Sequence, residues 1–324
     1  MTPLHVKLVA AAVGILATLL LCRKITSIAK LMATLWIGML VTIGWVILAG
    51  TLHFNAHLAF AFPPNAFTLT TSAFLGFGSA TLYIMYCYLG YYAVCYLGDE
   101  VFDPVRNLPR SMIISVITVA VLFYLTSLSI LGVVPWREAA ASQFVASEFM
   151  QRVYGSWAGV AITILILWTA FAATYALMLA YSRIPFAAAR DGNFFAVFAR
   201  LHPEKDFPHY SLVLVGGLTV VASFFALDTV IQALMTGRIL VQFIGQIIAL
   251  VYLRKCRPEV PRPFKMYLYP LPTAVALLGW MYVFVAAGAK YVTYGVLSLV
   301  LGGVAFLIMS KACRSWPFAA PSES

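Results

Sequence analysis

Six tyrosines surround a glycine inside a long apolar segment, and these residue types at this spacing are suited to binding a small molecule. They are Tyr83, Tyr86, Tyr88, Tyr91, Tyr92 and Tyr96, with Gly90 among them. Inside a bilayer every backbone N–H and C=O group needs a partner, so a helix break there persists only where it is buried or lines a cavity. The pattern predicts a broken helix whose freed backbone groups and half-helix dipoles hold a ligand.

Two interpretations of this tyrosine cluster are possible. Tyrosine is enriched where membrane helices meet the interface, which explains Tyr83 or Tyr96 near the ends of the cluster. It explains Tyr88 and Tyr91 poorly, because they flank Gly90 well inside the apolar segment. We therefore expect the centre of the cluster to line a cavity, with ordinary helix packing around a tolerated glycine as the alternative.

A short segment with charges of both signs follows the tyrosines. Its charged members include Asp99, Glu100, Arg106 and Arg110. The sequences at 103–104 and 107–109 are typical of two consecutive helix starts, each with a capping side chain and a proline in the first turn. One interpretation is an inner gate whose ion pairs re-form as the half-helix moves. The other is a solvated loop held by weak surface pairs.

A charged residue inside an apolar span suggests function, because burying it in hydrocarbon is costly. Arg238 lies within the apolar segment 230–253, on the outer side of its middle. Its side chain can extend outward to the interface or face a cavity, and we group it with the predicted gate. The predicted spans contain no lysine, aspartate or glutamate at mid-depth, so the sequence offers no obvious proton relay.

Enzyme motifs are absent from the sequence. It has no glycine-rich phosphate loop ending in Gly-Lys-Ser/Thr and no His/Cys cluster with metal-ligand spacing. The five cysteines show neither disulfide nor metal spacing and are expected to act as small apolar residues. We therefore expect neither catalysis nor a cofactor, and any transport would be driven by a gradient or by exchange.

Composition indicates a membrane protein. The chain has 324 residues, of which 63% are hydrophobic and 10% charged, with a mean hydropathy of +0.93. Soluble domains carry about 25% charged residues. The net charge of +10 would suggest a nucleic-acid partner in a soluble protein. Here the basic residues lie in short loops between apolar segments, so we expect a lipid bilayer and no nucleic acid.

At about 20 apolar residues per helix, the chain contains about nine transmembrane spans within one domain, residues 1–316. They are predicted at 6–22, 31–50, 72–97, 111–134, 156–182, 210–227, 230–253, 271–289 and 291–310. Most Lys and Arg residues fall in the loops on one side, which predicts a cytoplasmic C-terminus and an external N-terminus. Residues 135–155 are then an external loop with an interfacial helix. Residues 317–324 are expected to be a disordered cytoplasmic tail.

Three groups of motifs, in order along the chain, are similar to those of one transporter family. The segment 98–110 resembles the Glu-Val-x-x-Pro-x-Arg-x-x-Pro-Arg motif after the sixth span of amino acid–polyamine–organocation permeases. Segment 182–193 resembles the cytoplasmic exit of that family's eighth span. The third group, similar to the tenth span and the loop beyond it, is 241–246, 257–265 and 269–272. The resemblance runs from about Arg23 to Lys311.

This resemblance implies an all-α membrane protein with the leucine-transporter type of inverted-repeat fold. The predicted spans would match spans four to twelve of a twelve-span permease, which agrees with an external N-terminus. The implied sixth-span substrate site is Tyr86, Cys87, Tyr88, Leu89, Gly90 and Tyr91. Trp168 and Ala172 would form the eighth-span wall, although the small residues of 168–174 equally suit close helix packing.

Two features of the family have no counterpart in this sequence. The glycine-rich break of the first span is absent, and residues 31–50 lack the lysine that some members use in place of sodium. Symport, antiport and uniport therefore remain alternatives. The leading hypothesis is secondary active transport of amino acids by alternating access, by a multi-pass protein of the plasma (inner) membrane. The alternative is a non-transporting remnant or a membrane subunit that depends on a partner.

Overall fold

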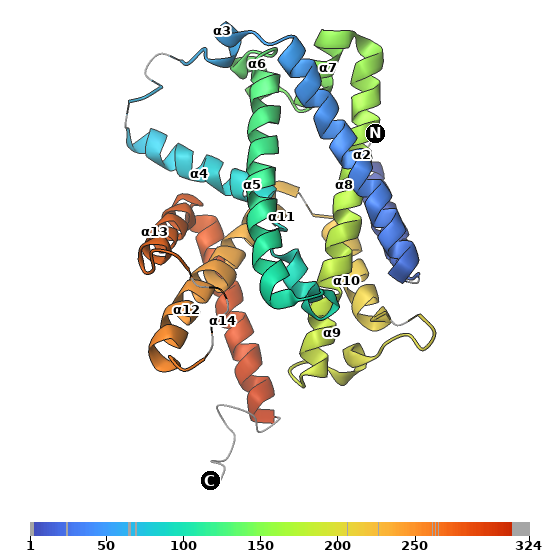
Figure 1. Ribbon diagram of the computed structural model, residues 1–324, viewed down its shortest axis with the longest axis vertical. Helices are drawn as coiled ribbons and strands as arrows, with labels where there is room; N and C mark the ends of the chain where they lie inside the picture. Colours follow the sequence, from blue (N-terminus) through green and yellow to red (C-terminus); the bar gives the residue numbers. More distant parts are fainter. Residues whose placement is uncertain are drawn as a thin grey trace. The chain divides into compact units, whose positions relative to one another are not determined.

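A computed structural model describes residues 3–23, 25–63, 66–68, 70–205, 207–225, 227–260, 262, 264 and 266–312. The predicted tail 317–324 lies outside these residues. The described chain forms helices and no strands, so the predicted all-α membrane transporter fold is confirmed (Figure 1). The chain divides into two compact units. Residues 1–66 and 88–224 form the first, residues 67–87 and 225–324 form the second, and each is described by itself.

Helices of different length build the two units. The first contains α1 (Pro3–Leu21), α2 (Ile25–Leu52), α3 (Ala56–Ala59), η1 (Ala93–Glu100), α5 (Pro104–Leu131), α6 (Trp136–Ala141), α7 (Val145–Tyr154), α8 (Ser156–Tyr181), α9 (Arg183–Arg190), η2 (Ala196–Ala199) and α10 (His209–Ala222). The second contains α4 (Thr71–Tyr88, its last residue excepted), α11 (Leu227–Arg238), the π-helix η3 (Ile239–Ile244), α12 (Gly245–Cys256), α13 (Leu271–Ala286) and α14 (Ala289–Ala312).

Each predicted span falls on helical structure. Within the described residues, the helices long and apolar enough to cross a membrane are Ile28–Leu52, Pro104–Leu131, Ser156–Arg190 and Leu234–Cys256. Shorter apolar helices cover His5–Leu21, His209–Ala222, Leu271–Ala286 and Val292–Ile308. Because hydrocarbon requires each span to satisfy its own backbone groups, helix is the expected form of all of them. That every shorter helix crosses the bilayer stays a prediction.

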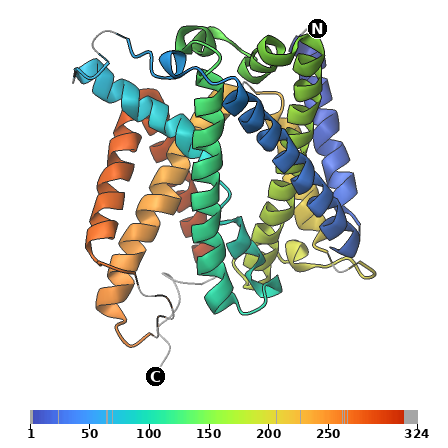
Figure 2. The same cartoon turned by 45° about the horizontal axis from the view of Figure 1, so that its top comes forward.

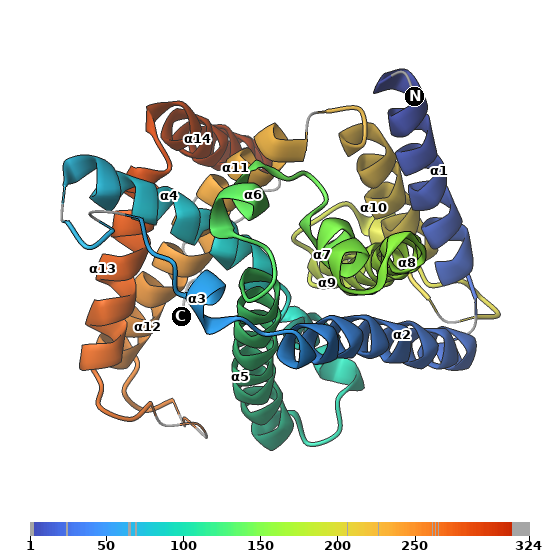
Figure 3. The same cartoon turned by 90° about the horizontal axis from the view of Figure 1, so that it is seen from above.

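In the first unit, α2 packs against both α8 and α5. Figure 2 shows α2 (dark blue) inclined to α5 (green), and the carboxyl ends of the two helices meet where Gly50 lies against Ser129. Gly38 faces the indole of Trp168 on α8. Lipid is as apolar as the helices themselves, so membrane helices associate mainly through close packing, which small residues allow. On the other side of α8, α1 and α10 lie side by side (Figure 3).

The segment 135–155, predicted to be an external loop, folds as two short helices. A helix was predicted from the spacing of its apolar residues, and α7 confirms it. Phe149 is fully buried, in a cluster with Ala158 and Ile162 of α8, whereas Phe144 just before the helix is 70% exposed. The buried side of α7 therefore packs on protein. An ion pair of 2.6 Å between Arg152 Nη2 and Glu138 Oε2 joins α7 to α6.

In the second unit, the span predicted at 230–253 contains a π-helical turn. The residues Ile239–Ile244 form η3 between α11 and α12. Phe243 of this turn stacks on Trp280 of α13, with ring centroids 4.0 Å apart. Near the start of α4, the hydroxyl of Tyr282 donates a hydrogen bond to the carbonyl of Phe74. The apolar pattern predicted one uninterrupted helix at 230–253. A π-helical turn does not change how apolar the span is, so the pattern could not reveal it.

Candidate substrate site

The predicted helix break is present at Gly90. Helix α4 ends at Tyr88, a turn follows, and η1 begins at Ala93. Gly90 has a φ of +114°, a backbone conformation that residues other than glycine rarely adopt. Its carbonyl accepts a hydrogen bond of 2.8 Å from the amide of Ala93, which closes the turn. Glycine is needed here for its backbone conformation and not for lack of space, because a Cβ at this position would meet no atom within 4 Å.

Aromatic contacts continue from the break along η1. The rings of Tyr91 and Tyr92 lie 5.1 Å apart, those of Tyr92 and Tyr96 lie 5.9 Å apart, and Tyr96 contacts Tyr181 of α8 at 5.9 Å. These distances are typical of edge-to-face aromatic packing. Tyr92 is buried. Through Tyr96 and Tyr181, these tyrosines connect η1 to the end of α8. Tyr96 therefore has a packing role in addition to any role at the interface.

The predicted sixth-span residues fall into both units. Tyr86 and Cys87 close α4 in the second unit, and both side chains are exposed. Tyr88, Leu89, Gly90 and Tyr91 belong to the first unit and are half-buried. Within that unit Tyr88 packs against Phe123 of α5, with ring centroids 6.2 Å apart. The boundary between the units, between Cys87 and Tyr88, thus falls within the set of predicted residues, just before the break at Gly90.

The predicted eighth-span residues lie where α8 meets its neighbours. The indole Nε1 of Trp168 donates a hydrogen bond of 3.3 Å to the carbonyl of Leu35 on α2. Ala172 is buried in a cluster with Leu35 and with Ala17 of α1. These contacts are those of helix packing, the alternative that the small residues of 168–174 left open. The assignment of the pair to a substrate wall stays a prediction.

The charged segment after η1 differs in one respect from the expectation. It starts a single helix, α5, with Pro109 inside it, where two helix starts were predicted. Asp103 has a φ of +42° and its backbone carbonyl accepts hydrogen bonds from the amides of Arg106 and Asn107. The amide nitrogen Nδ2 of Asn107 donates to the carbonyl of Phe102 at 2.6 Å. Asn107 therefore ties the helix start to the preceding turn and does not cap a second helix.

The predicted gate residues lie in different surroundings. Arg106 and Arg110 are exposed on the first turns of α5. The side chains of Asp99 and Glu100 lie outside the described residues. Arg238 is half-buried at the end of α11, directly before the π-helical turn. The structure therefore leaves the gate as a prediction.

A basic cavity near η1 was not predicted from the sequence. Its volume is about 320 Å³, and it is lined by Cys95, Tyr96, Gly98, Arg183, Ile184, Ala187 and Arg190. The guanidinium of Arg183 donates to the carbonyl of Leu179 at 3.4 Å and to Oγ of Ser182 at 3.2 Å. The spacing of Arg183 and Arg190, seven residues apart, places both on one face of a helix and was the available signal.

The apolar helices and the broken span are those of a multi-pass integral membrane protein. The family model described as "Amino acid permease" matches residues 1–308. This chain therefore belongs to the amino acid permease family, and the predicted membership of the amino acid–polyamine–organocation group is confirmed.

Individual relatives agree with this family. The branched-chain amino acid permease BcaP of Bacillus subtilis is 24% identical over 241 residues, covering 73% of this chain and 52% of the relative. The human cystine/glutamate transporter is 28% identical over 207 residues, with 63% and 41% covered. The large neutral amino acids transporter small subunit 2 of Rattus norvegicus is 25% identical over 304 residues, with 92% and 56% covered. The chain spans about half the length of these curated relatives.

Proposed function

We propose that this chain transports amino acids as a secondary active permease, by alternating access around the break at Gly90. The observation that carries the proposal is the left-handed φ of Gly90, which separates α4 from η1 inside a span of an amino acid permease. A break at this depth frees backbone groups that a polar substrate can satisfy. The transport cycle then needs no chemical step.

The break suits the two charged groups that every free amino acid carries. The last carbonyls of α4 form the negative end of its helix dipole, which favours an ammonium group. The amino end of η1 is the positive end of its backbone dipole, which favours a carboxylate. In this proposal Tyr86, Cys87, Tyr88, Leu89 and Tyr91 surround the substrate. Their uncharged, largely aromatic side chains favour a neutral or large amino acid over a dibasic one.

Gating is proposed to involve the charges that follow this break in the chain. Asp99 and Glu100 lie at the end of η1, and Arg106 and Arg110 lie on the first turns of α5. A movement of η1 would change the distances between these groups, and their ion pairs would re-form in each state. Arg238 would act toward the outside. We further propose that the protein lies in the plasma (inner) membrane with its C-terminus in the cytoplasm, because most Lys and Arg residues fall in the loops on one side.

A second candidate is a membrane subunit that does not transport without a partner. The chain spans about half the length of its curated relatives. The family's glycine-rich first-span break has no counterpart in this sequence. The two candidates differ in whether the isolated chain moves substrate.

Uptake into proteoliposomes that contain only the full chain separates the candidates. We expect saturable uptake of radiolabelled leucine that falls at least tenfold in Gly90→Val, because a β-branched residue is strained at this φ. Gly76→Val is the matched control on the same span. A Cβ at Gly76 meets nothing within 4 Å and its backbone is helical, so uptake should stay within about twofold.

Each outcome decides between the candidates. Uptake of the unsubstituted chain at the level of empty liposomes would overturn transport by this chain alone and favour the partner-dependent subunit. Equal loss of uptake in Gly90→Val and Gly76→Val would show that the break has no special role. Gel filtration of each variant in detergent checks that its fold is intact before reconstitution.

A further inference from the structure

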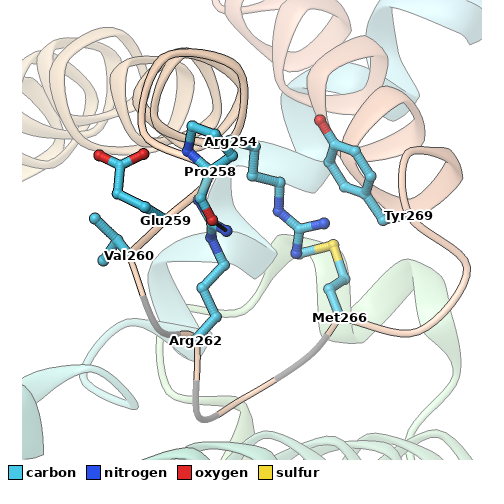
Figure 4. Close-up of a pocket in the computed structure, with 7 residues that line it drawn as sticks. All are labelled: Arg254, Pro258, Glu259, Val260, Arg262, Met266 and Tyr269. Carbon is cyan, nitrogen blue, oxygen red and sulfur yellow. Dashed lines mark hydrogen bonds between the residues drawn. The ribbon is translucent and has the colours of Figure 1, made fainter.

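The carboxyl end of α12, in the second unit, carries a groove with a basic and an apolar side. Two adjoining cavities form it, of about 660 Å³ and 350 Å³, and Arg254, Val260 and Arg262 line both (Figure 4). The first is completed by residues that include Glu259, Met266 and Tyr269. The second is completed by Leu250, Leu253, Arg257 and Phe264. We call these two cavities together the α12 groove.

Two arginines of the α12 groove are fixed by contacts within the protein. The guanidinium carbon of Arg254 lies 3.9 Å from the ring centroid of Tyr269, a close cation–π contact. Arg262 donates hydrogen bonds to the carbonyls of Leu253, Arg257 and Pro258, at 3.2, 2.8 and 3.3 Å. These bonds fold the loop back onto the carboxyl end of the helix. The basic side of the groove is thereby preorganised.

The positive charge of the groove is not balanced by acidic side chains. In the part of the chain that the structure describes, no ion pair involves Arg254, Arg257 or Arg262. Arg254 Nε is buried and has no hydrogen-bond partner. Glu259 lines the larger cavity, but its carboxylate points away from Arg254 and Arg262 (Figure 4). An anionic group entering the groove would meet guanidinium donors that suit the geometry of a phosphate.

The other side of the α12 groove is apolar and open. Leu253 and Phe264 are each 50% exposed and Val260 is 48% exposed. Leu250 lies about one turn before Arg254 on the same helix. These residues continue the long apolar span Leu234–Cys256 up to the arginines. An apolar wall that meets a fixed basic cluster at the end of a span matches a phospholipid, with acyl chains along the wall and phosphate at the guanidinium groups.

We propose that the α12 groove binds an anionic phospholipid, with its phosphate held by Arg254, Arg257 and Arg262 and its acyl chains against Leu250, Leu253 and Phe264. The occupant is a lipid because a free phosphate would leave the apolar wall exposed to water. An uncharged headgroup would leave the arginines without a net counter-charge. The groove shares no residue with the proposed substrate site at Gly90, and the proposal does not depend on transport activity.

Native mass spectrometry of the full chain in a neutral detergent tests the proposal. Dioctanoyl phosphatidylglycerol should bind saturably and more tightly than dioctanoyl phosphatidylcholine. The variant Arg254→Gln/Arg257→Gln should weaken phosphatidylglycerol binding by about fivefold for each arginine removed, roughly 25-fold in all. Lys255→Gln is the control for the loss of one positive charge, because Lys255 lies between the two arginines in sequence but lines neither cavity. Its binding should be unchanged.

Three results would overturn the proposal. These are equal binding of the two lipids, an equal loss in Lys255→Gln, and complete competition by inorganic phosphate at the concentration of the lipid. The last result would indicate a free phosphate site. If the double variant fails to fold, Arg257→Gln alone provides the test, because Arg257 is exposed at the end of α12. That single variant should lose about fivefold in lipid affinity.

Discussion

At the scale of single residues, the contact between Gly38 and Trp168 explains why α2 and α8 lie close together. A Cβ at Gly38 would overlap the indole of Trp168, whose Nε1 is bonded to the carbonyl of Leu35. Gly38→Ala should therefore lower the free energy of unfolding in detergent by about 1–3 kcal/mol through overpacking. The measurement is the thermal unfolding of the purified chain.

Another glycine of the same helix provides the control. A Cβ at Gly44 would meet no atom within 4 Å, so Gly44→Ala should be neutral or stabilising by up to about 1 kcal/mol, through helix propensity. Similar destabilisation by both substitutions would contradict a specific contact between α2 and α8 at Gly38.

At the scale of elements, α7 packs one apolar face against α8 and leaves a neighbouring apolar residue exposed. Phe149 is fully buried against α8, so Phe149→Ala should cost about 3–5 kcal/mol of unfolding free energy. Phe144 precedes the same helix and is exposed, so Phe144→Ala should change stability by less than about 0.5 kcal/mol. Thermal unfolding of both variants distinguishes the two surroundings. If Phe144→Ala were the more harmful, α7 would have to contact its neighbours differently.

At the scale of the whole molecule, the proposed topology places the segment 135–155 outside and the segment 191–208 in the cytoplasm. Ala140 and Glu204 are exposed positions of these two segments. A cysteine at Ala140 should react with a membrane-impermeant maleimide in intact cells, above the level of the unsubstituted chain. A cysteine at Glu204 should react only after the membrane is permeabilised. The reverse labelling pattern would invert the topology.

The sequence by itself determined the class of protein, the place of the helices and the position of the break. Low charge and long apolar segments admit few structures in a bilayer other than helices. Gly90 stood out because a glycine between tyrosines, inside a span, is a local signal. The motif at 98–110 indicated the family in the same way, because it consists of residues close together in the chain.

Only the tertiary structure decided which face of each helix meets protein. Trp168 and Ala172 turn toward α2 and α1, α7 buries Phe149 on α8, and a π-helical turn interrupts the span after Arg238. The α12 groove likewise depends on Arg262 folding its loop back onto the helix. In a membrane protein the faces toward lipid and toward other helices are both apolar, so hydrophobic periodicity cannot distinguish them. That choice is made by packing between residues distant in sequence, which only the folded chain brings together.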